Sequence, residues 1–283
     1  MRWPTLTTYD RQDPDGNFID DFNKSYLGIR FLIGFLGLAL PLTLVVVDAA
    51  FLDGKAEVRG SMSAYYHSPA RDLFVGGLWA TGVVLVSYLW WKFKTWDFSL
   101  SLVAGIAVLS VATFPTGRPD VDASGTSCAT VTAPPCAAIQ ETLGEGAVEV
   151  AHKTAAAFVV VSFAALCLVF ALREFGYGKA AHRLAPGRLG VRNVWKLLRR
   201  HPSRRKEFAR TYLYLGCMAG VLLGAIWCLL GPHWLAPPVY MGELMAFSSF
   251  GAAWIVASWD LFPRRRQDAT EDPSTPKASD TTV

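Results

Sequence analysis

The chain has 283 residues, of which 52% are hydrophobic and 18% charged, with a formal net charge of +4. Ordinary soluble domains carry about 25% charged residues, so this composition argues against a soluble domain and is typical of a membrane protein. Membrane topology accounts for the basic residues, and no nucleic-acid-binding motif accompanies them. We therefore expect no nucleic-acid partner.

Six apolar windows run along the chain, each about as long as a membrane-spanning helix. A hydrocarbon core about 30 Å thick needs roughly 20 apolar residues in helical conformation. Within lipid every backbone polar group must be paired inside the segment, which favours helices. We therefore predict an all-α membrane protein in which residues 28–262 form a six-helix transmembrane bundle. The windows are Phe31–Ala50, Leu73–Trp91, Phe98–Thr116, Thr154–Leu172, Thr211–Gly231 and Val239–Trp259.

The positive charges predict the orientation of this bundle. If the N-terminus is cytoplasmic, 22 of the 27 lysines and arginines fall on the cytoplasmic side, as the positive-inside rule requires. Both termini are then cytoplasmic. The cytoplasmic parts are an N-terminal segment (1–27), a basic loop (173–210) and a polar tail (263–283), which we predict to be disordered. The loop 117–151 is extracytoplasmic.

Two cysteines lie in the stretch SCATVTAPPC of the predicted extracytoplasmic loop. Cys128 and Cys136 are eight residues apart, and a turn at the two intervening prolines would bring them within the distance that a disulfide bridges. Disulfides form and persist outside the cytoplasm. We predict a disulfide between Cys128 and Cys136; the alternative is two free thiols in a flexible loop.

A polar motif, SMSAYYHSPARD (residues 61–72), precedes the second apolar window at its predicted outer end. Pro69 fits the first position of a helix, so Ser63 and His67 are expected to precede the helix rather than to lie on it. Asp72 then falls in the first helical turn, where a negative charge is favourable. Helix initiation does not account for the serine, the histidine or the arginine of this motif.

Ionisable side chains of other windows lie at the same predicted depth as this motif. Charged groups near the hydrocarbon are costly and usually face a partner or a wet cavity. We therefore expect them to form one outward-facing site between helices. The groups come from four predicted helix ends and are Asp48, His67, Asp72, His152 and Glu243.

One interpretation of this site is a structural network of hydrogen bonds and ion pairs. Arg71 would supply the cation and pair with Glu243 or Asp72, and Asp48 and Tyr66 would belong to the same network. Such a network would hold the helix ends in register, because each buried charge needs a partner.

The other interpretation is a metal site. His67, His152 and Glu243 carry the imidazole and carboxylate groups that bind zinc, with room for a water ligand. No local spacing such as HExxH ties these residues together. Both interpretations remain open at this point.

Four stretches of the chain together resemble an uncharacterised family of six-span bacterial membrane proteins, a domain of unknown function. The stretches are SMSAYYHSPARDLFVGG, HKTAAAFVVVSFA, RTYLYLGCM and GELMAFSSFGAAWI. The resemblance implies a multi-pass protein of the bacterial plasma membrane, but it brings no activity. The positions that match the family's motifs are Ser61, Ser63, Tyr65, Tyr66, Arg71, Asp72, His152 and Glu243.

The same motif is loosely similar to that of the CREST membrane hydrolases, which include the alkaline ceramidases. Their motif has a histidine four residues after a serine, as Ser63 and His67 are spaced here. In that superfamily histidines bind zinc, and the metal-bound water attacks an amide. The chain departs from the superfamily in having six apolar windows instead of seven and in lacking its HxxxH pair.

Two functional classes follow from these observations. In the first, the protein binds a lipid or a protein partner at the outward-facing site without catalysis. In the second, it is a metal-dependent hydrolase of a lipid-like substrate at the outer leaflet. Zinc would then lie on His67, His152 and Glu243, with Asp72 as the base and Ser63 as a second catalytic group.

Overall fold

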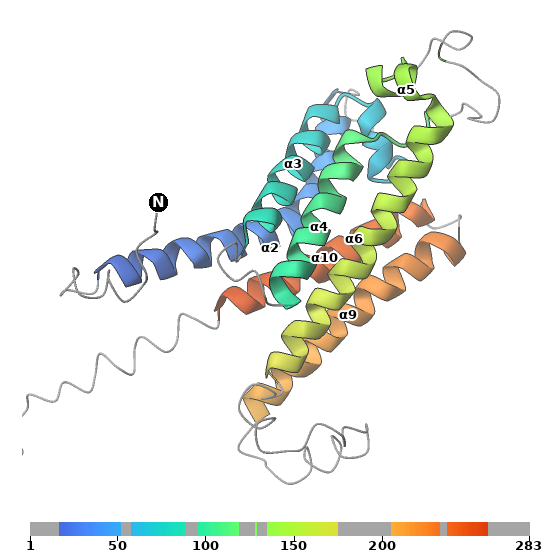
Figure 1. Ribbon diagram of the computed structural model, residues 1–283. Coiled ribbons are helices and arrows are strands. Elements are labelled where there is room, and N and C mark those ends of the chain that lie inside the picture. The colour runs from blue at the N-terminus through green and yellow to red at the C-terminus, as the bar shows by residue number, and fades with distance from the viewer. Residues whose placement is uncertain are drawn as a thin grey trace, which may run out of the picture.

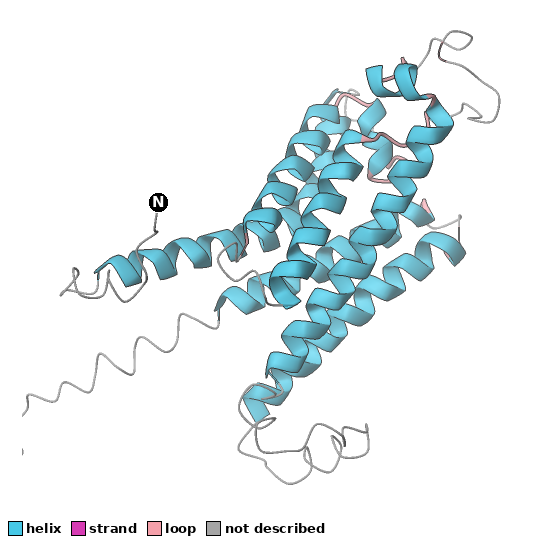
Figure 2. Cartoon of the chain, in the orientation of Figure 1, coloured by secondary structure: helices cyan, strands magenta, loops and turns pink. Residues whose placement is uncertain are grey.

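The computed structural model describes residues 17–51, 58–88, 96–118, 128, 135–174, 205–232 and 237–259. In these ranges the chain forms seven α-helices and one 3-10 helix, and it has no strand (Figure 2). The predicted all-α fold is confirmed. The elements are α2 (Asn17–Phe51), η1 (Ser63–His67), α3 (Arg71–Ser87), α4 (Trp96–Thr113), α5 (Ala138–Leu143), α6 (Glu145–Glu174), α9 (Arg205–Leu230) and α10 (Pro238–Trp259).

Some predicted segments fall outside the described residues. The tail (263–283) lies entirely outside them, as do most of the N-terminal segment (1–27) and most of the basic loop (173–210). The loop 117–151 is partly helical, because it contains α5 and the first residues of α6.

Four helices are long and apolar enough to cross a membrane, namely Leu27–Phe51, Glu145–Arg173, Arg210–Leu230 and Pro238–Ser258. The second and third predicted windows also form helices, but these are shorter. The apolar part of α4 covers Phe98–Thr113, and α3 has 17 residues and ends where Tyr88 adopts an extended backbone. The fold is therefore that of a helical membrane protein, and the number of six spans stays a prediction.

The six helices of the apolar windows form a ring in which each packs against the next in the order α2, α3, α4, α6, α9, α10 (Figure 1). The ring closes because α10 packs against α2, so the last helix lies beside the first. The short helix α5 lies at one end of the bundle (Figure 1). This is the end that the charge distribution predicts to be extracytoplasmic.

Glycines allow the helices of this ring to approach closely, as is common in membrane proteins. A Cβ atom added to Gly251 of α10 would lie 2.7 Å from the carbonyl oxygen of Gly34 in α2. A Cβ atom on Gly105 of α4 would lie 2.8 Å from the carbonyl oxygen of Gly82 in α3. The contact between α9 and α10 is made in the same way by Gly224 and Gly242.

Aromatic side chains fill the part of the ring farthest from α5. Trp254 of α10 is fully buried, and its ring contacts those of Tyr88 and Phe170 edge-on, with centroids 4.8 and 5.2 Å apart. One turn earlier, Phe250 is also buried and contacts Trp254. Such edge-on pairs are favourable aromatic arrangements. The interior is therefore packed in this half.

The polar motif at residues 61–72 forms a 3-10 turn followed by a helix. Ser63 and His67 are the first and last residues of η1, and α3 begins four residues after η1 ends. Asp72 lies in the first turn of α3. The prediction that Ser63 and His67 precede the helix is confirmed.

Candidate functional site

A small pocket lies inside the ring between α3, α4, α6, α9 and α10, next to η1. Its volume is about 70 Å³. Three polar side chains line it, namely Ser63 of η1, His152 of α6 and Glu243 of α10. Most of the remaining wall is apolar and includes Phe74, Leu78, Val108, Val160 and Phe247. Three of the predicted site residues thus share one cavity.

Glu243 lies in the second turn of α10 and is hydrogen-bonded to the segment that leads into η1. Its Oε2 atom accepts a hydrogen bond from the backbone N–H of Met62, with 2.5 Å between the atoms. The backbone N–H of Tyr240 in the same helix donates to the carbonyl of Gly60 at 3.2 Å. These two bonds fix η1 beside the beginning of α10.

His152 and Ser63 are nearly inaccessible to solvent, with relative exposures of 5% and 6%. The Nδ1 atom of His152 lies 2.6 Å from the carbonyl oxygen of Phe114. A carbonyl can only accept, so Nδ1 carries the proton, and Nε2 of the neutral ring is then an acceptor. The Ser63 hydroxyl is hydrogen-bonded to that of Ser61 at 3.0 Å.

The third predicted metal ligand, His67, and the predicted base, Asp72, lie outside the pocket lining. His67 is directed toward the chain after α4, where its Nε2 atom lies 3.1 Å from the carbonyl oxygen of Thr116. Asp72 is exposed. Of the residues that the hydrolase hypothesis requires, His152 and Glu243 therefore line the pocket, whereas His67 and Asp72 do not.

The residues of the predicted polar network form separate pairs. Arg71 donates a hydrogen bond to the hydroxyl of Tyr66 at 2.8 Å, and its guanidinium carbon lies 4.4 Å from the centre of that ring, a cation–π arrangement. Asp48 is buried and pairs with Arg59 at 2.8 Å. Within the described ranges, the ion pairs of the structure do not include Glu243.

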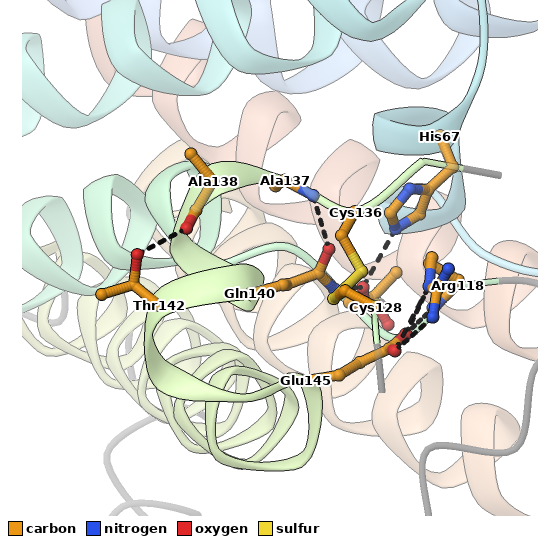
Figure 3. The surroundings of a disulfide bond; sticks show 10 residues. His67, Arg118, Cys128, Cys136, Ala137, Ala138, Gln140, Thr142 and Glu145 are labelled. Carbon is orange, nitrogen blue, oxygen red and sulfur yellow. Dashed lines mark hydrogen bonds and ion pairs between the residues drawn. A yellow bond between two sulfur atoms is a disulfide. The ribbon is translucent and has the colours of Figure 1, made fainter. Parts of the chain in front are cut away.

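A second group of polar residues, the loop cluster, surrounds the disulfide and contains His67, Arg118, Gln140 and Glu145 (Figure 3). Thr116 belongs to it as well, because its carbonyl oxygen is hydrogen-bonded to His67 and Gln140. Arg118 and Glu145 form an ion pair at 2.9 Å, and their side chains are 0% and 1% exposed. The backbone N–H of Arg118 also donates to Glu145 at 3.0 Å. The Nε2 atom of Gln140 donates to the carbonyl of Thr116 at 3.2 Å.

The predicted disulfide is confirmed. The sulfur atoms of Cys128 and Cys136 are 2.01 Å apart, and their Cα atoms are 5.9 Å apart. The bridge lies beside Arg118 and Gln140 (Figure 3). It therefore ties the loop after α4 to the segment that leads into α5.

The geometry gives the zinc hypothesis no support. In the part of the chain that the structure describes, one set of three His, Cys, Asp or Glu donor atoms lies within 4.8 Å of one another, formed by Cys128, Cys136 and Glu145. Zinc binds thiolates, whereas these sulfur atoms are joined in a disulfide, and Glu145 is already paired with Arg118. A metal bound by His67, His152 and Glu243 stays a prediction.

Sequence reasoning gave Arg118, Gln140 and Glu145 no role. A local signal does precede Glu145: Gly144 has a φ of 85° and follows the last residue of α5. Glycine is the usual residue after a helix end, and an acidic residue is favourable in the first turn of the next helix. The glycine and the acidic residue that follows it together indicate that α6, the helix of the fourth apolar window, begins at Glu145. The apolar window itself starts only at Thr154.

The loop cluster predicts a pH dependence of stability that involves His67. Burial lowers the pKa of His67 below its usual value, with an opposing contribution from the hydrogen bond to Thr116 and a further lowering by Arg71. The unfolded chain then binds a proton at higher pH than the folded chain does, so the contribution of His67 to stability is complete above about pH 6.5 and is lost as the pH falls through the lowered pKa. His67→Gln keeps a donor for the carbonyl but does not titrate.

The expected result is that wild-type protein loses more stability than His67→Gln between pH 7.5 and pH 5. Thermal unfolding of both proteins in the same detergent at the two pH values measures this difference. His152 and the carboxylates are common to both proteins, so their contributions cancel in the comparison. Equal losses would show that His67 does not titrate differently on folding.

Comparison with known proteins gave no match: no family model fits the chain, and neither a curated protein nor a solved structure resembles it significantly. The resemblances to the six-span bacterial family and to the CREST hydrolases therefore stay predictions.

Proposed function

We propose that the protein is a multi-pass membrane protein of the bacterial plasma membrane that binds the small polar end of a lipid-like amphiphile without catalysis. The pocket inside the ring carries this proposal, because it combines an apolar wall with Ser63, His152 and Glu243. The charge distribution along the sequence supports six spans, cytoplasmic termini and a pocket near the outer leaflet.

The size of the pocket favours one part of an amphiphile over a whole molecule. Sites that enclose a drug-sized ligand have volumes of about 300–1,000 Å³, whereas this cavity measures about 70 Å³. It suits a head group of a few heavy atoms and the first carbons of an alkyl chain. A protein segment would need a groove, so we favour a lipid-like ligand over a protein partner.

The positions of His67 and Asp72 favour binding over hydrolysis. The hydrolase hypothesis needs His67 as a metal ligand and Asp72 as a base, and neither lines the cavity. Catalysis requires such groups within hydrogen-bond reach of the reacting atoms. The cavity itself offers polar groups that can hold a ligand.

Blocking the pocket tests the proposal. Ala156 of α6 lines the cavity, whereas the next residue, Ala157, is exposed on the same helix. Ala156→Phe places a ring in the cavity, and Ala157→Phe adds the same ring outside it. Native mass spectrometry of protein purified in mild detergent should show a bound amphiphile on wild type and on Ala157→Phe, and little or none on Ala156→Phe.

Circular dichroism and thermal unfolding of both variants control for folding. If wild type carries no amphiphile after extraction, short-chain lipids can be added back and the same comparison made. Equal retention by Ala156→Phe and Ala157→Phe would contradict binding in the pocket.

A further inference from the structure

The polar groups of the pocket differ in what they can offer a ligand. Glu243 presents a carboxylate, which when ionised has about four acceptor positions, and the backbone of Met62 uses one of them. His152 donates through Nδ1 to Phe114, which makes Nε2 of the neutral ring an acceptor. Ser63 has a hydroxyl that can donate or accept. Hydrogen-bond acceptors therefore predominate.

The pocket also lacks a cation of its own. Lysine and arginine are missing from its lining residues, which all belong to the described ranges. The described basic residues near this end of the bundle are engaged elsewhere: Arg59 with Asp48, Arg71 with Tyr66, Arg118 with Glu145 and Lys153 with Glu149. A carboxylate in such surroundings favours a positively charged ligand and disfavours an anionic one.

We infer that the pocket recognises a primary ammonium group on an alkyl chain, an inference that rests on the proposed function. An ammonium group has three N–H donors, and Glu243, His152 and Ser63 can each accept one of them. The ammonium–carboxylate bond is charge-assisted and therefore stronger than a neutral hydrogen bond. The carbons of the ligand next to the nitrogen would contact the apolar wall.

Other head groups fit these residues less well. A phosphate or carboxylate would bring its negative charge beside Glu243 with no basic side chain to receive it. A quaternary ammonium has no N–H donor for the three acceptors. Three residues of types that bind zinc, His152, Cys228 and Glu243, line this cavity, but their donor atoms do not all lie within 4.8 Å of one another.

The experiment compares single-chain amphiphiles of equal length on the full-length protein in phosphatidylcholine nanodiscs. The probes are dodecylamine, dodecanol, dodecanoate and dodecyltrimethylammonium, and specific binding is the difference between wild type and Ala156→Phe. We expect dodecylamine to bind at least about tenfold more tightly than the other three, because a charge-assisted hydrogen bond contributes more than a neutral one.

Glu243→Gln should lower the affinity for dodecylamine about tenfold, because the amide has no negative charge. The affinity for dodecanol should stay nearly unchanged, because the amide keeps an acceptor for the backbone N–H of Met62. Glu149→Gln serves as the matched control, since Glu149 lies on the same helix as His152 but does not line the pocket, and it should change neither affinity. If Glu243→Gln does not fold, the comparison of head groups on wild type decides.

The outcomes separate the two proposals. Equal specific binding of all four probes, or a preference for dodecanoate, would overturn the ammonium inference and leave the amphiphile site intact. Loss of dodecylamine binding on addition of a chelator would overturn it in favour of a metal. No specific binding of any probe would overturn the proposed function itself.

Discussion

Glu145→Ala is expected to lower the free energy of unfolding by about 3–5 kcal/mol, because it removes the carboxylate that pairs with a buried cation. The Arg118 and Glu145 side chains are 0% and 1% exposed, so water cannot readily replace the lost carboxylate. Equilibrium unfolding in mixtures of dodecyl maltoside and sodium dodecyl sulfate measures the difference from wild type.

Two further variants make this result specific. Glu149→Ala, one turn later in α6, removes a partner of Lys153, whose side chain is 70% exposed, and should cost less than about 1 kcal/mol. The double variant Arg118→Leu/Glu145→Leu removes both charges and should recover much of the loss, apart from the backbone N–H of Arg118 that Glu145 satisfied. A loss for Glu145→Ala as small as that for Glu149→Ala would show that the buried pair contributes little.

Gly251→Ala is expected to destabilise the bundle by about 1–3 kcal/mol, because the added methyl group overpacks the contact between α10 and α2. It would lie 2.7 Å from the carbonyl oxygen of Gly34 and 3.0 Å from the backbone nitrogen of Leu38. Backbone atoms cannot rotate away as a side chain can, so the two helices must move apart. The same unfolding assay measures the change.

Gly76→Ala is the matched control for this contact. Gly76 lies in the middle of α3, and a Cβ atom there would have nothing within 4 Å. Alanine favours helix by about 1 kcal/mol over glycine, so this variant should be neutral or slightly more stable. If Gly76→Ala destabilised the protein as much as Gly251→Ala does, the contact between α10 and α2 would not be the cause of either effect.

The sequence was sufficient to predict elements that depend on local composition. Apolar length predicted the helices, and two cysteines eight residues apart in a proline-containing loop predicted the disulfide that forms between Cys128 and Cys136. The sequence overestimated the length of the second helix, because Tyr88 leaves the helical conformation inside an apolar window. Hydropathy does not report where a backbone changes direction.

The site was predicted only in part, because its geometry depends on backbone conformation. Ser63 and His67 are four residues apart, a spacing that places two side chains on one face of an α-helix but about a third of a turn apart in a 3-10 helix. The segment is a 3-10 helix, and accordingly Ser63 lines the pocket while His67 contacts Thr116.

The same reasoning applies to Asp72, which lies two residues before Phe74 in α3. Residues two apart lie on nearly opposite sides of an α-helix, and Phe74 lines the pocket, so Asp72 is left exposed. The ion pair between Arg118 and Glu145 joins residues 27 apart. No sequence periodicity specifies such a pairing, and the disulfide and the start of α6 have to be placed before it can be found.

The closure of the ring by α10 has a consequence for biosynthesis. Glu243 accepts its hydrogen bond from Met62, which is 181 residues earlier in the chain, and the hydroxyl of Tyr240 donates to the carbonyl of Pro41 at 2.8 Å. Because a nascent chain leaves the ribosome from its N-terminus, α2 and η1 are made long before α10. Until α10 is inserted, the glycine face of α2 is uncovered and the pocket has neither Glu243 nor one of its walls. The proposed ligand could therefore bind only when synthesis of the last helix is complete, and every chain truncated before Pro238 is expected to be unable to bind it.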